Sequence, residues 1–466
     1  MRIHQITMTP FSFQTITDFE SGSMLNEHGY AKISGYVTEQ QRNEALGLMA
    51  DDVWGTVCFQ DEDGKSGILF CGLAVNMQIE TENDCYLMTL ELKTGTYLMD
   101  LKEHIRVFQS GSTTYGEIQN SFLPGYAMGE CLMVNSDSNT DQMLVQYRET
   151  DWEFAKRLAS RKNTVIVPNE KSEGVKYAFG LAEKNAEKLV SYDKLEMHKK
   201  IGEYQIKKQN GISGIEESDE IGYTVDSREI FFLGDCVVFG EKNYLVTEVH
   251  RTWVKKEVWN RYVLKTLKGT QMVEHHNKKI IGASLQGVVT DVEKDLVKIT
   301  IHKDENGNQG GQKWFAYSTV FSSPDGTGWY CMPEKDDSIQ LHFPNEVEDS
   351  AYVSSSVNMQ PSDPEARSNP DHKSIKNKQG KEILFTPDKL VITNNKGMTI
   401  TIDDEAGIIM ESDKDILMKA EESIGLISEK QDLQMIAAEK VSLKQNATSL
   451  ELADDIVMHG GKVNIQ

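Results

Sequence analysis

The chain has 466 residues, of which 39% are hydrophobic and 26% are charged, as is typical of a soluble protein with several domains. Its net charge of −23 argues against a nucleic-acid-binding surface, which would be basic. No run of about 18 apolar residues occurs, and the N-terminus lacks a basic stretch followed by an apolar one. We therefore expect a protein that is made and assembled in the cytoplasm without a signal peptide.

Residue patterns that would indicate catalysis or metal binding are missing. There is no HExxH motif and no Cys/His quartet with zinc spacing, and the six cysteines, which include no CxxC pair, are expected to be reduced. His275 and His276 are adjacent, so in a strand they would point to opposite faces. Threefold symmetry could gather three copies of His459, but a solvent-facing turn fits this residue better. We predict no catalytic, cofactor-binding or metal-binding residues.

An amphipathic helix is predicted to begin near Thr150, in the segment QYRETDWEF (residues 146–154). Thr150 or Asp151 can cap its first turn, where acidic side chains also favour the positive end of the helix dipole. The apolar side chains that would anchor this helix to a core are Trp152, Phe154 and Leu158.

Trp253 and Trp259 interleave with basic residues in HRTWVKKEVWNRY, a pattern that also occurs where proteins bind nucleic acid or carbohydrate. Lys255 and Lys256 are offset by nearby acidic residues, including Glu257. A strand that places tryptophan at an interface therefore fits this segment better.

Residues 283–359 form short alternating runs separated by turn-forming sequences. The runs that read as strands are LQGVVTDV, LVKITIH, WFAYSTVF, GWYCMP, SIQLHF and AYVSSSV. We predict a small closed barrel of about five strands. The polar segment QPSDPEARSNPDHKSIKNKQG follows the barrel and reads as a linker.

The C-terminal region, after Pro387, contains no Phe, Tyr, Trp, Cys or Pro. Pairs of apolar residues, with one residue between them, recur there every eight or nine residues, which predicts short strands with one apolar face. A coiled coil would need a sustained spacing of about 3.5 residues and fits less well.

One chain cannot enclose a core with this repeat. Each buried aliphatic side chain contributes about 1.5–3 kcal/mol, whereas ordering each backbone residue costs about 1–2 kcal/mol. We therefore predict that copies of the chain wind around a common axis as a trimer. The predicted trimer-core residues are Ile408, Met410, Ile416, Met418, Ile424, Leu426, Leu433, Met435, Val441, Leu443, Leu450 and Leu452.

Several segments resemble the VgrG spike proteins of contractile injection systems. In the barrel region these are WFAYS (314–318), GWYCMP (328–333) and DSAYV (349–353). NPDHK (369–373), followed by GKEI (380–383), is similar to the junction before the family's trimeric β-helix, although lysine stands where the family usually has histidine.

The same resemblance extends into the N-terminal region. It rests on LMDLKEHIRVFQ, which ends in Arg106, Phe108 and Gln109, and on the segment QYRETDWEF. The first 60 residues match the family poorly, and the repeat is short of the Val-Gly dipeptides that are common in the family.

The resemblance implies a mainly β protein with four regions. Residues 1–280 would form a tail-hub-like region of β-barrels with short helices, and residues 281–360 an OB-like (oligosaccharide-binding-like) barrel. Residues 361–382 would be a linker, and residues 383–466 a needle in which three chains form an intertwined β-helix.

For function, the resemblance implies the structural central spike and hub of a contractile injection apparatus, of the secretion-system, phage-tail or tailocin type. Such a homotrimer joins a hexameric tube protein and baseplate proteins to a membrane-piercing needle, and it is exported or fired as part of a particle. Its needle end binds a small conical, PAAR-like tip protein, and effector cargo is a further partner. The predicted tip-binding residues are Val463, Asn464 and Ile465.

The rival interpretation is a trimeric tailspike-like enzyme or binder that acts on cell-surface polysaccharide. Such proteins present grooves with aromatic residues and paired carboxylates, which a repeat of eight residues without aromatics does not offer. The segments between the barrel and the needle, and after the needle, are also too short for an added catalytic domain. We therefore predict no enzyme activity, no cofactor and no nucleic-acid partner.

Overall fold

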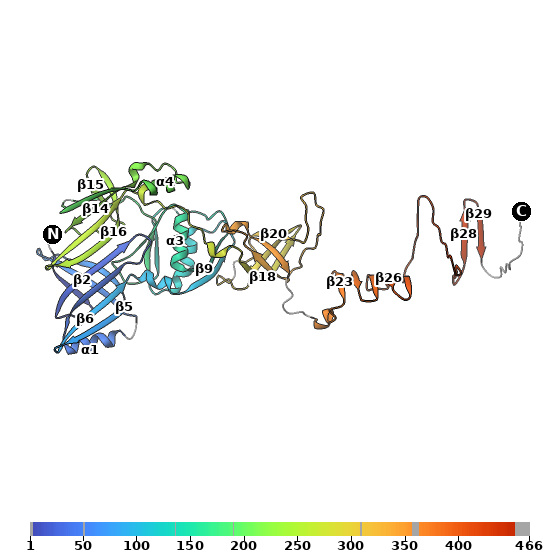
Figure 1. The fold of residues 1–466 in the computed structure, drawn as a ribbon, viewed down its shortest axis with the longest axis horizontal. Helices are drawn as coiled ribbons and strands as arrows, with labels where there is room; N and C mark the ends of the chain where they lie inside the picture. Colours follow the sequence, from blue (N-terminus) through green and yellow to red (C-terminus); the bar gives the residue numbers. More distant parts are fainter. Residues whose placement is uncertain are drawn as a thin grey trace. The chain divides into compact units, whose positions relative to one another are not determined.

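The computed structural model describes residues 3–49, 52–135, 137–189, 191–307, 310–356 and 363–452. The chain divides into two compact units, residues 1–360 and 361–466, and each is described by itself. Strands dominate both units, as the sequence predicted (Figure 1). None of the helices within the described residues is both long and apolar enough to cross a membrane.

The largest element of the first unit is a twelve-stranded sheet. Its main path runs β1-β4-β5-β6-β3-β2-β16-β17-β14-β13, and β15 pairs with both β12 and β16. The strands are β1 (Ile3–Thr9), β2 (Thr15–Met24), β3 (Tyr30–Val37), β4 (Trp54–Asp61), β5 (Ser66–Glu82), β6 (Cys85–Lys93), β12 (Glu187–Lys188), β13 (Lys194–Lys199), β14 (Ile221–Ser227), β15 (Cys236–Phe239), β16 (Lys242–Val254) and β17 (Glu257–Lys265).

The sheet has two halves, each with its own hydrophobic core. Phe19, Ile33 and Leu90 belong to the core of the N-terminal half, and Leu245 and Tyr262 to that of the other half. β16 is long enough to pair with β15, β17 and β2, so it joins the two halves into one sheet.

The strand predicted around the two tryptophans is confirmed. Trp253 pairs with Val258 and Thr252 with Trp259 across the β16–β17 hairpin. Lys255 and Lys256 form its turn with positive φ, and the Arg228 guanidinium lies 4.0 Å from the centre of the Trp259 ring. His275 and His276, by contrast, lie in a segment without regular structure and not in a strand.

Four helices and several short elements complete the hub region. The helices are α1 (Glu39–Leu48), α2 (Tyr115–Phe122), α3 (Asp151–Arg161) and α4 (Ile201–Gln209), with 3₁₀ turns η1 (Gly95–Asp100), η2 (Leu123–Gly125), η3 (Glu217–Glu220), η4 (Lys268–Thr270) and η5 (Lys278–Ile280). Two small sheets flank α3: β7 (Glu103–Phe108) pairs with β9 (Leu144–Thr150), and β11 (Lys176–Phe179) pairs with β10 (Ile166–Pro168) and β8 (Glu130–Met133).

The predicted five-stranded barrel is confirmed as a closed barrel in the order β18-β19-β20-β22-β21. Its strands are β18 (Ser284–Glu293), β19 (Leu296–Ile301), β20 (Trp314–Ser318), β21 (Ser338–His342) and β22 (Tyr352–Ser356), with η6 (Glu348–Ser350) before the last. GWYCMP (328–333), which was predicted to be a strand, is a loop instead. The parallel pairing of β20 with β22 closes the barrel, so no edge is left for a sixth strand.

In the second unit, after η7 (Pro364–Arg367), five antiparallel strands form a meander in chain order. They are β23 (Lys373–Lys376), β24 (Glu382–Phe385), β25 (Lys389–Thr393), β26 (Met398–Asp403) and β27 (Gly407–Ser412). The sheet therefore begins at Lys373, inside the segment that the sequence predicted to be linker. A hairpin of β28 (Val441–Gln445) and β29 (Thr448–Leu452) follows.

Three of the predicted repeat strands are absent from this single chain. Residues 416–418, 424–426 and 433–435 have no strand structure, and the described chain between β27 and β28 contains no strand. A backbone segment becomes a strand only when a neighbour satisfies its amide and carbonyl groups. Within this chain, these segments find no such neighbour.

Candidate functional site: an unpartnered apolar sheet face

The strand register gathers the large apolar side chains of the second unit on one face of its sheet. Because side chains alternate along a strand, residues that pair across strands share a face. One row runs through Ile383, Ile392, Ile400 and Met410, and the neighbouring row through Phe385, Leu390, Ile402 and Ile408. We call these eight residues the apolar face.

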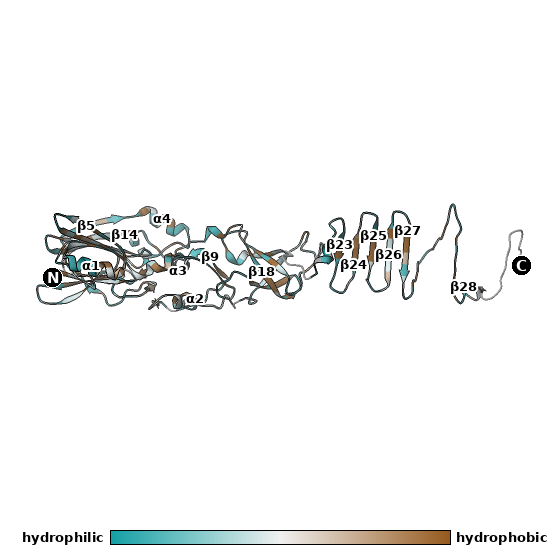
Figure 2. Ribbon diagram, turned by 90° about the horizontal axis from the view of Figure 1, so that it is seen from below, coloured by the Kyte–Doolittle hydropathy of each residue, from teal (hydrophilic) through white to brown (hydrophobic). Residues whose placement is uncertain are grey.

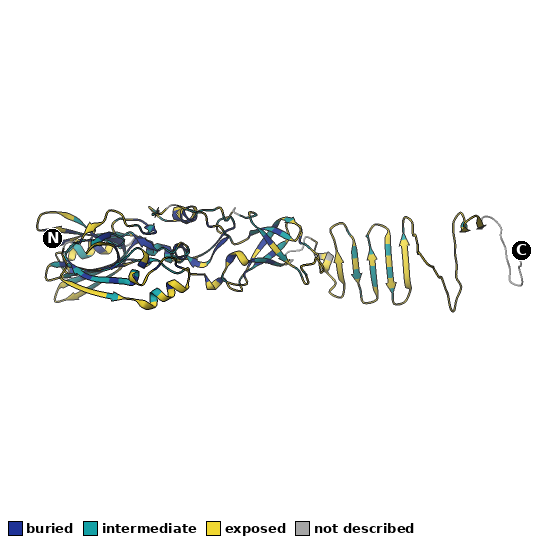
Figure 3. Ribbon diagram, turned by 90° about the horizontal axis from the view of Figure 1, so that it is seen from above, coloured by how far each residue is buried: buried dark blue, intermediate teal, exposed yellow. Residues whose placement is uncertain are grey.

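Little in the chain covers the apolar face. Ile408 is 69% exposed, Met410 57% and Phe385 48%, which is far from the near-complete burial of core residues in the first unit. Figure 2 shows the apolar colouring of strands β24 to β27, and Figure 3 their exposure. A contiguous apolar surface of this kind marks an interaction site, whereas single exposed apolar residues do not.

The opposite face of the sheet is more polar. Its middle row contains Leu384, Val391, Thr401 and Ile409, and charged residues flank that row. Lys389 Nζ lies 3.9 Å from Asp403 Oδ2, and Asp403 also accepts hydrogen bonds from the backbone N–H groups of Ala406 and Glu405, which lower the pKa of its carboxyl group. The charged residues that flank the middle row therefore favour contact of this face with water.

The predicted trimer-core residues fall into three groups. Ile408 and Met410 lie on the apolar face. In the β28–β29 hairpin the backbone of Val441 pairs with that of Leu452, and Leu443 pairs with Leu450, so Leu443 and Leu450 share a face. The members that lie outside strands, with exposed side chains, are Ile416, Met418, Ile424, Leu426, Leu433 and Met435.

The predicted tip-binding residues Val463, Asn464 and Ile465, and also His459, lie outside the described residues.

The prediction of core residues missed six members of the apolar face, which precede the repeat. The alternation of residues in Leu390-Val391-Ile392 and in TITI (399–402) could have indicated them. The six are Ile383, Phe385, Leu390, Ile392, Ile400 and Ile402.

The two N-terminal segments that resemble VgrG proteins meet in the first unit. β7 and β9 pair so that Arg106 lies opposite Gln146. The Arg106 guanidinium donates to the Gln146 side-chain oxygen at 2.7 Å and to the Asp151 carboxylate. Asp151 is 1% exposed and also accepts from Tyr126 Oη at 2.7 Å, and burial raises the pKa of that tyrosine. Polar residues of both segments thus form one buried network.

A second buried ionic cluster fixes α3 to the barrel. Arg157 on α3 donates to Glu149 Oε1 and to Glu348 Oε1 at 2.7 Å each, and to the Val145 carbonyl at 2.8 Å. All three charged side chains are less than 10% exposed, and burial raises the pKa of the Glu149 carboxyl group. Glu348 belongs to η6, so this cluster joins α3 to the barrel.

Gln109 strengthens the same joint by binding barrel backbone. Its Nε2 donates to the Ile299 carbonyl at 3.0 Å, and its Oε1 accepts from the backbone N–H groups of Gln312 and Lys313 at 3.2 and 3.3 Å. Gln109 is 3% exposed, so its three hydrogen bonds are buried and orient the elements that they join.

The predicted helix near Thr150 is confirmed as α3. The Thr150 hydroxyl accepts from Glu153 N at 3.1 Å, and Glu153 Oε2 accepts from Thr150 N at 3.1 Å, which completes a capping box. Trp152, Phe154 and Leu158 are fully buried, as predicted.

Replacing Thr150 by alanine is expected to lower the free energy of unfolding by about 2 kcal/mol, the upper end for a lost N-cap. The cost is at the upper end because the Thr150 hydroxyl also donates to the Asp100 carboxylate. Thr38→Ala removes the same type of capping box from the surface helix α1 and is expected to cost about 1 kcal/mol or less. Urea-induced unfolding of both variants measures the difference, and equal costs would contradict it.

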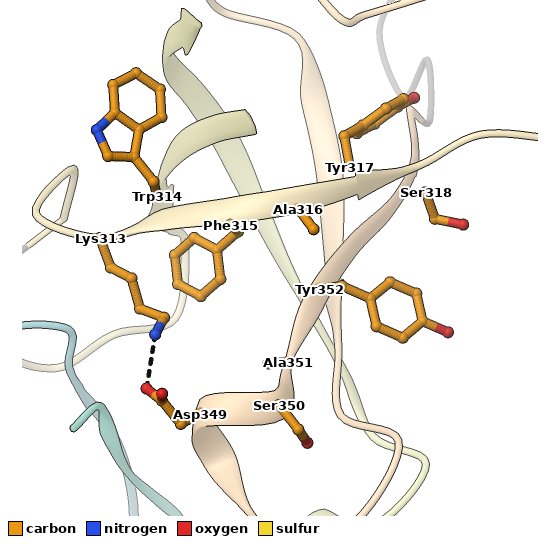
Figure 4. A pocket seen from close by; sticks show the side chains of 10 residues that line it. All are labelled: Lys313, Trp314, Phe315, Ala316, Tyr317, Ser318, Asp349, Ser350, Ala351 and Tyr352. Carbon is orange, nitrogen blue, oxygen red and sulfur yellow. Dashed lines mark hydrogen bonds and ion pairs between the residues drawn. The ribbon is translucent and has the colours of Figure 1, made fainter. Parts of the chain in front are cut away.

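A groove on the surface of the barrel has a volume of about 580 Å³. It lies where β20 and the segment before β22 diverge, and an ion pair between Lys313 Nζ and Asp349 Oδ1, 2.6 Å long, closes one end (Figure 4). Lys313 and Asp349 in its lining bind each other, and the Phe315 ring is buried in the barrel core. Within the described residues, no group of three or more His, Cys, Asp or Glu side chains could hold a metal ion.

Comparison with known proteins identifies the fold. No family model and no curated protein matches the chain. Among solved structures, the Escherichia coli c3393 protein, a component of the type VI secretion system, is similar over 76% of this chain and 100% of its own, with 11% identity and a TM-score of 0.53. VgrG complexes with PdpA from Francisella give 10% identity, 88% coverage of both chains and a TM-score of 0.54. The chain therefore has a VgrG-like fold.

Proposed function

We propose that this protein is the central hub and spike subunit of a contractile injection apparatus, and that three copies assemble into the working spike. The observation that carries the proposal is the apolar face of the C-terminal sheet, which one chain leaves exposed. The VgrG-like fold supports the same role, because c3393 is described as similar to the bacteriophage tail proteins gp27 and gp5.

Burial of the apolar face explains why copies would associate. Full transfer of a large apolar side chain from water to a core contributes about 1.5–3 kcal/mol. The eight side chains of the apolar face are partly exposed, so burying what remains exposed favours association. Three narrow sheets can close around an axis with all apolar faces inward, which leaves the polar faces in water. Two sheets stacked face to face would also cover the face, and the mass of the assembly distinguishes the two cases.

The segment between β27 and β28 would complete its structure only in the assembly. Residues 416–435 repeat the apolar pairs of β27 but form no strand within their own chain. We infer that these pairs form strands with the neighbouring copies. Such interwound chains resist bending and shear, which a needle driven through an envelope requires.

The hub would carry the connection to the tube. Each chain has one sheet with two halves and two cores, so three copies present six such halves to a hexameric tube protein. Baseplate proteins, a conical PAAR-like tip protein at residues 463–465 and effector cargo are the further partners we propose. The PdpA–VgrG complexes support the association of such a spike with other proteins. Assembly would take place in the cytoplasm before the particle is fired.

The native mass of the protein tests the trimer directly. We expect about three times 52.6 kDa for the full chain. Removal of residues 361–466 is expected to weaken this association greatly and to leave the first unit folded, because that unit has its own cores whereas the apolar face is lost. A full chain that stays monomeric at micromolar concentration would contradict the proposed function.

The rival function is a tailspike-like enzyme or polysaccharide binder, and the barrel groove is its best candidate site. The groove offers one ion-paired carboxylate, Asp349, where glycoside hydrolysis uses two separated carboxyl groups. We therefore expect no turnover of peptidoglycan or capsular polysaccharide by the purified protein. Release of reducing ends above background, abolished by Asp349→Asn, would favour the rival function.

A further inference from the structure

The loop after β20 folds into a hairpin that projects from the barrel. Trp329 N donates to the Phe321 carbonyl at 2.8 Å, and Ser323 N donates to the Thr327 carbonyl at 2.9 Å. Asp325 accepts from the Thr327 hydroxyl at 2.7 Å in the turn between them. We call residues 319–331 the aromatic hairpin.

Close backbone packing shapes this hairpin before any partner binds. Gly328 has φ of +136°, and a Cβ at this position would lie 2.4 Å from the Phe321 carbonyl oxygen, so only glycine fits without a shift. Tyr330 Oη donates to the Lys294 carbonyl at 2.8 Å, and Pro333 is buried at the base. The hairpin is therefore a defined projection.

The hairpin carries large apolar side chains that its own chain does not cover. Val320 is 91% exposed, Tyr330 75%, Trp329 56% and Phe321 54%. Tryptophan and tyrosine are the residues that most often dominate protein interfaces. A preformed hairpin with four such side chains in water has the features of an interface without its partner.

The charge of the hairpin indicates which partner covers it. Residues 316–333 contain a single charged residue, Asp325, in a chain with a net charge of −23. Identical acidic chains repel one another, so a contact between copies requires a surface with few charges. A basic partner would instead be expected to bind where acidic side chains gather.

The chain connectivity supplies the second argument for this partner. Only 16 residues separate β22 from β23, a span of at most about 60 Å when fully extended. In the proposed trimer, sheets that share one axis therefore keep three barrels close together, at a high effective concentration.

We propose that the aromatic hairpin packs against the neighbouring copy of this chain, so that the barrels as well as the needle hold the trimer together. This inference rests on the proposed function, because it needs the trimer. It assigns Val320, Phe321, Trp329 and Tyr330 to the contact between copies.

Native cysteines provide the first test. Cys331 lies in the aromatic hairpin and Cys85 in the hub, and both are exposed in the single chain. In the full-length assembly, a maleimide is expected to modify Cys331 much more slowly than Cys85, whereas both should react alike after unfolding in urea. Equal rates in an assembly that still has the mass of three chains would overturn the hairpin contact and leave the proposed function intact.

A photo-crosslinker at Tyr330 gives the second test. With benzoylphenylalanine in place of Tyr330, irradiation of the full-length protein should give covalent species of two and three chains on a denaturing gel. Benzoylphenylalanine in place of Gln286 is the control, and it should give no covalent species of two or three chains. Gln286 is exposed on β18, which pairs with neither β20 nor β22. Absence of covalent dimers from Tyr330 in a three-chain assembly would overturn the inference, and a single-chain native mass would overturn the proposed function with it.

Discussion

Replacement of Ile400 by lysine is expected to abolish the assembly of the three copies. Ile400 lies in the middle of the apolar face, between Ile392 and Met410. In the trimer, the substitution would bring three ammonium groups together in an apolar interior, where none of them has a partner. One uncompensated buried charge costs about 3–5 kcal/mol, so three of them exceed what the removed isoleucines contributed.

Thr399→Lys is the matched control for this variant. Thr399 is the preceding residue of the same strand, so its side chain points to the opposite face, where it pairs with Glu411. Lysine there would lie beside a carboxylate in water, and the trimer should survive. Native mass and resistance to heat in detergent measure both variants. If Thr399→Lys dissociated the assembly and Ile400→Lys did not, the opposite face of the sheet would have to be the buried one.

Replacement of Arg157 by methionine is expected to destabilise the first unit by about 3–5 kcal/mol, the cost of leaving buried charges without their partner. Arg157 is 4% exposed, and it is the shared partner of Glu149 and Glu348. Methionine replaces much of the volume, so the loss reports mainly on the two carboxylates. Urea-induced unfolding measures it, with the buried Trp152 on the same helix among the residues that report by fluorescence.

Arg261→Met is the control for a surface ion pair. Arg261 Nε binds Asp226 at 2.7 Å, but the arginine side chain is 53% exposed, so its loss should cost less than about 1 kcal/mol. An equal loss of stability in the two variants would show that the buried cluster contributes no more than a surface pair.

The loss of unfolding free energy in Arg157→Met, relative to the unchanged protein, should become smaller as the pH falls. Burial already raises the pKa of Glu149, and the removal of the guanidinium raises it further. A folded state whose carboxyl pKa exceeds the unfolded value binds the proton more tightly, so its stability falls as pH rises through that pKa. The difference in unfolding free energy between the variant and the unchanged protein should therefore decrease toward about pH 5. A difference that increases as the pH falls would contradict this account.

Local chemistry made several elements predictable from the sequence. The cap residue Thr150, followed by Glu153 and the apolar Trp152, Phe154 and Leu158, specifies a helix start and its buried side without knowledge of any distant residue. Alternation of apolar and polar residues likewise predicted the strands of the barrel, because period two places one set of side chains in its core. The order of the segments that resemble VgrG proteins predicted the VgrG-like fold.

Other features depend on contacts between residues far apart in sequence, so only the tertiary structure decided them. Nothing local indicates that Arg157 meets Glu348, or that Arg106 and Asp151 belong to one network. GWYCMP alternates like a strand, but the parallel pairing of β20 with β22 leaves it no partner, and it stays a loop. The apolar spacing in residues 416–435 likewise predicts strands, but the single chain forms none there. Spacing determines which faces can be buried, whereas strand formation depends on the neighbours that satisfy the backbone.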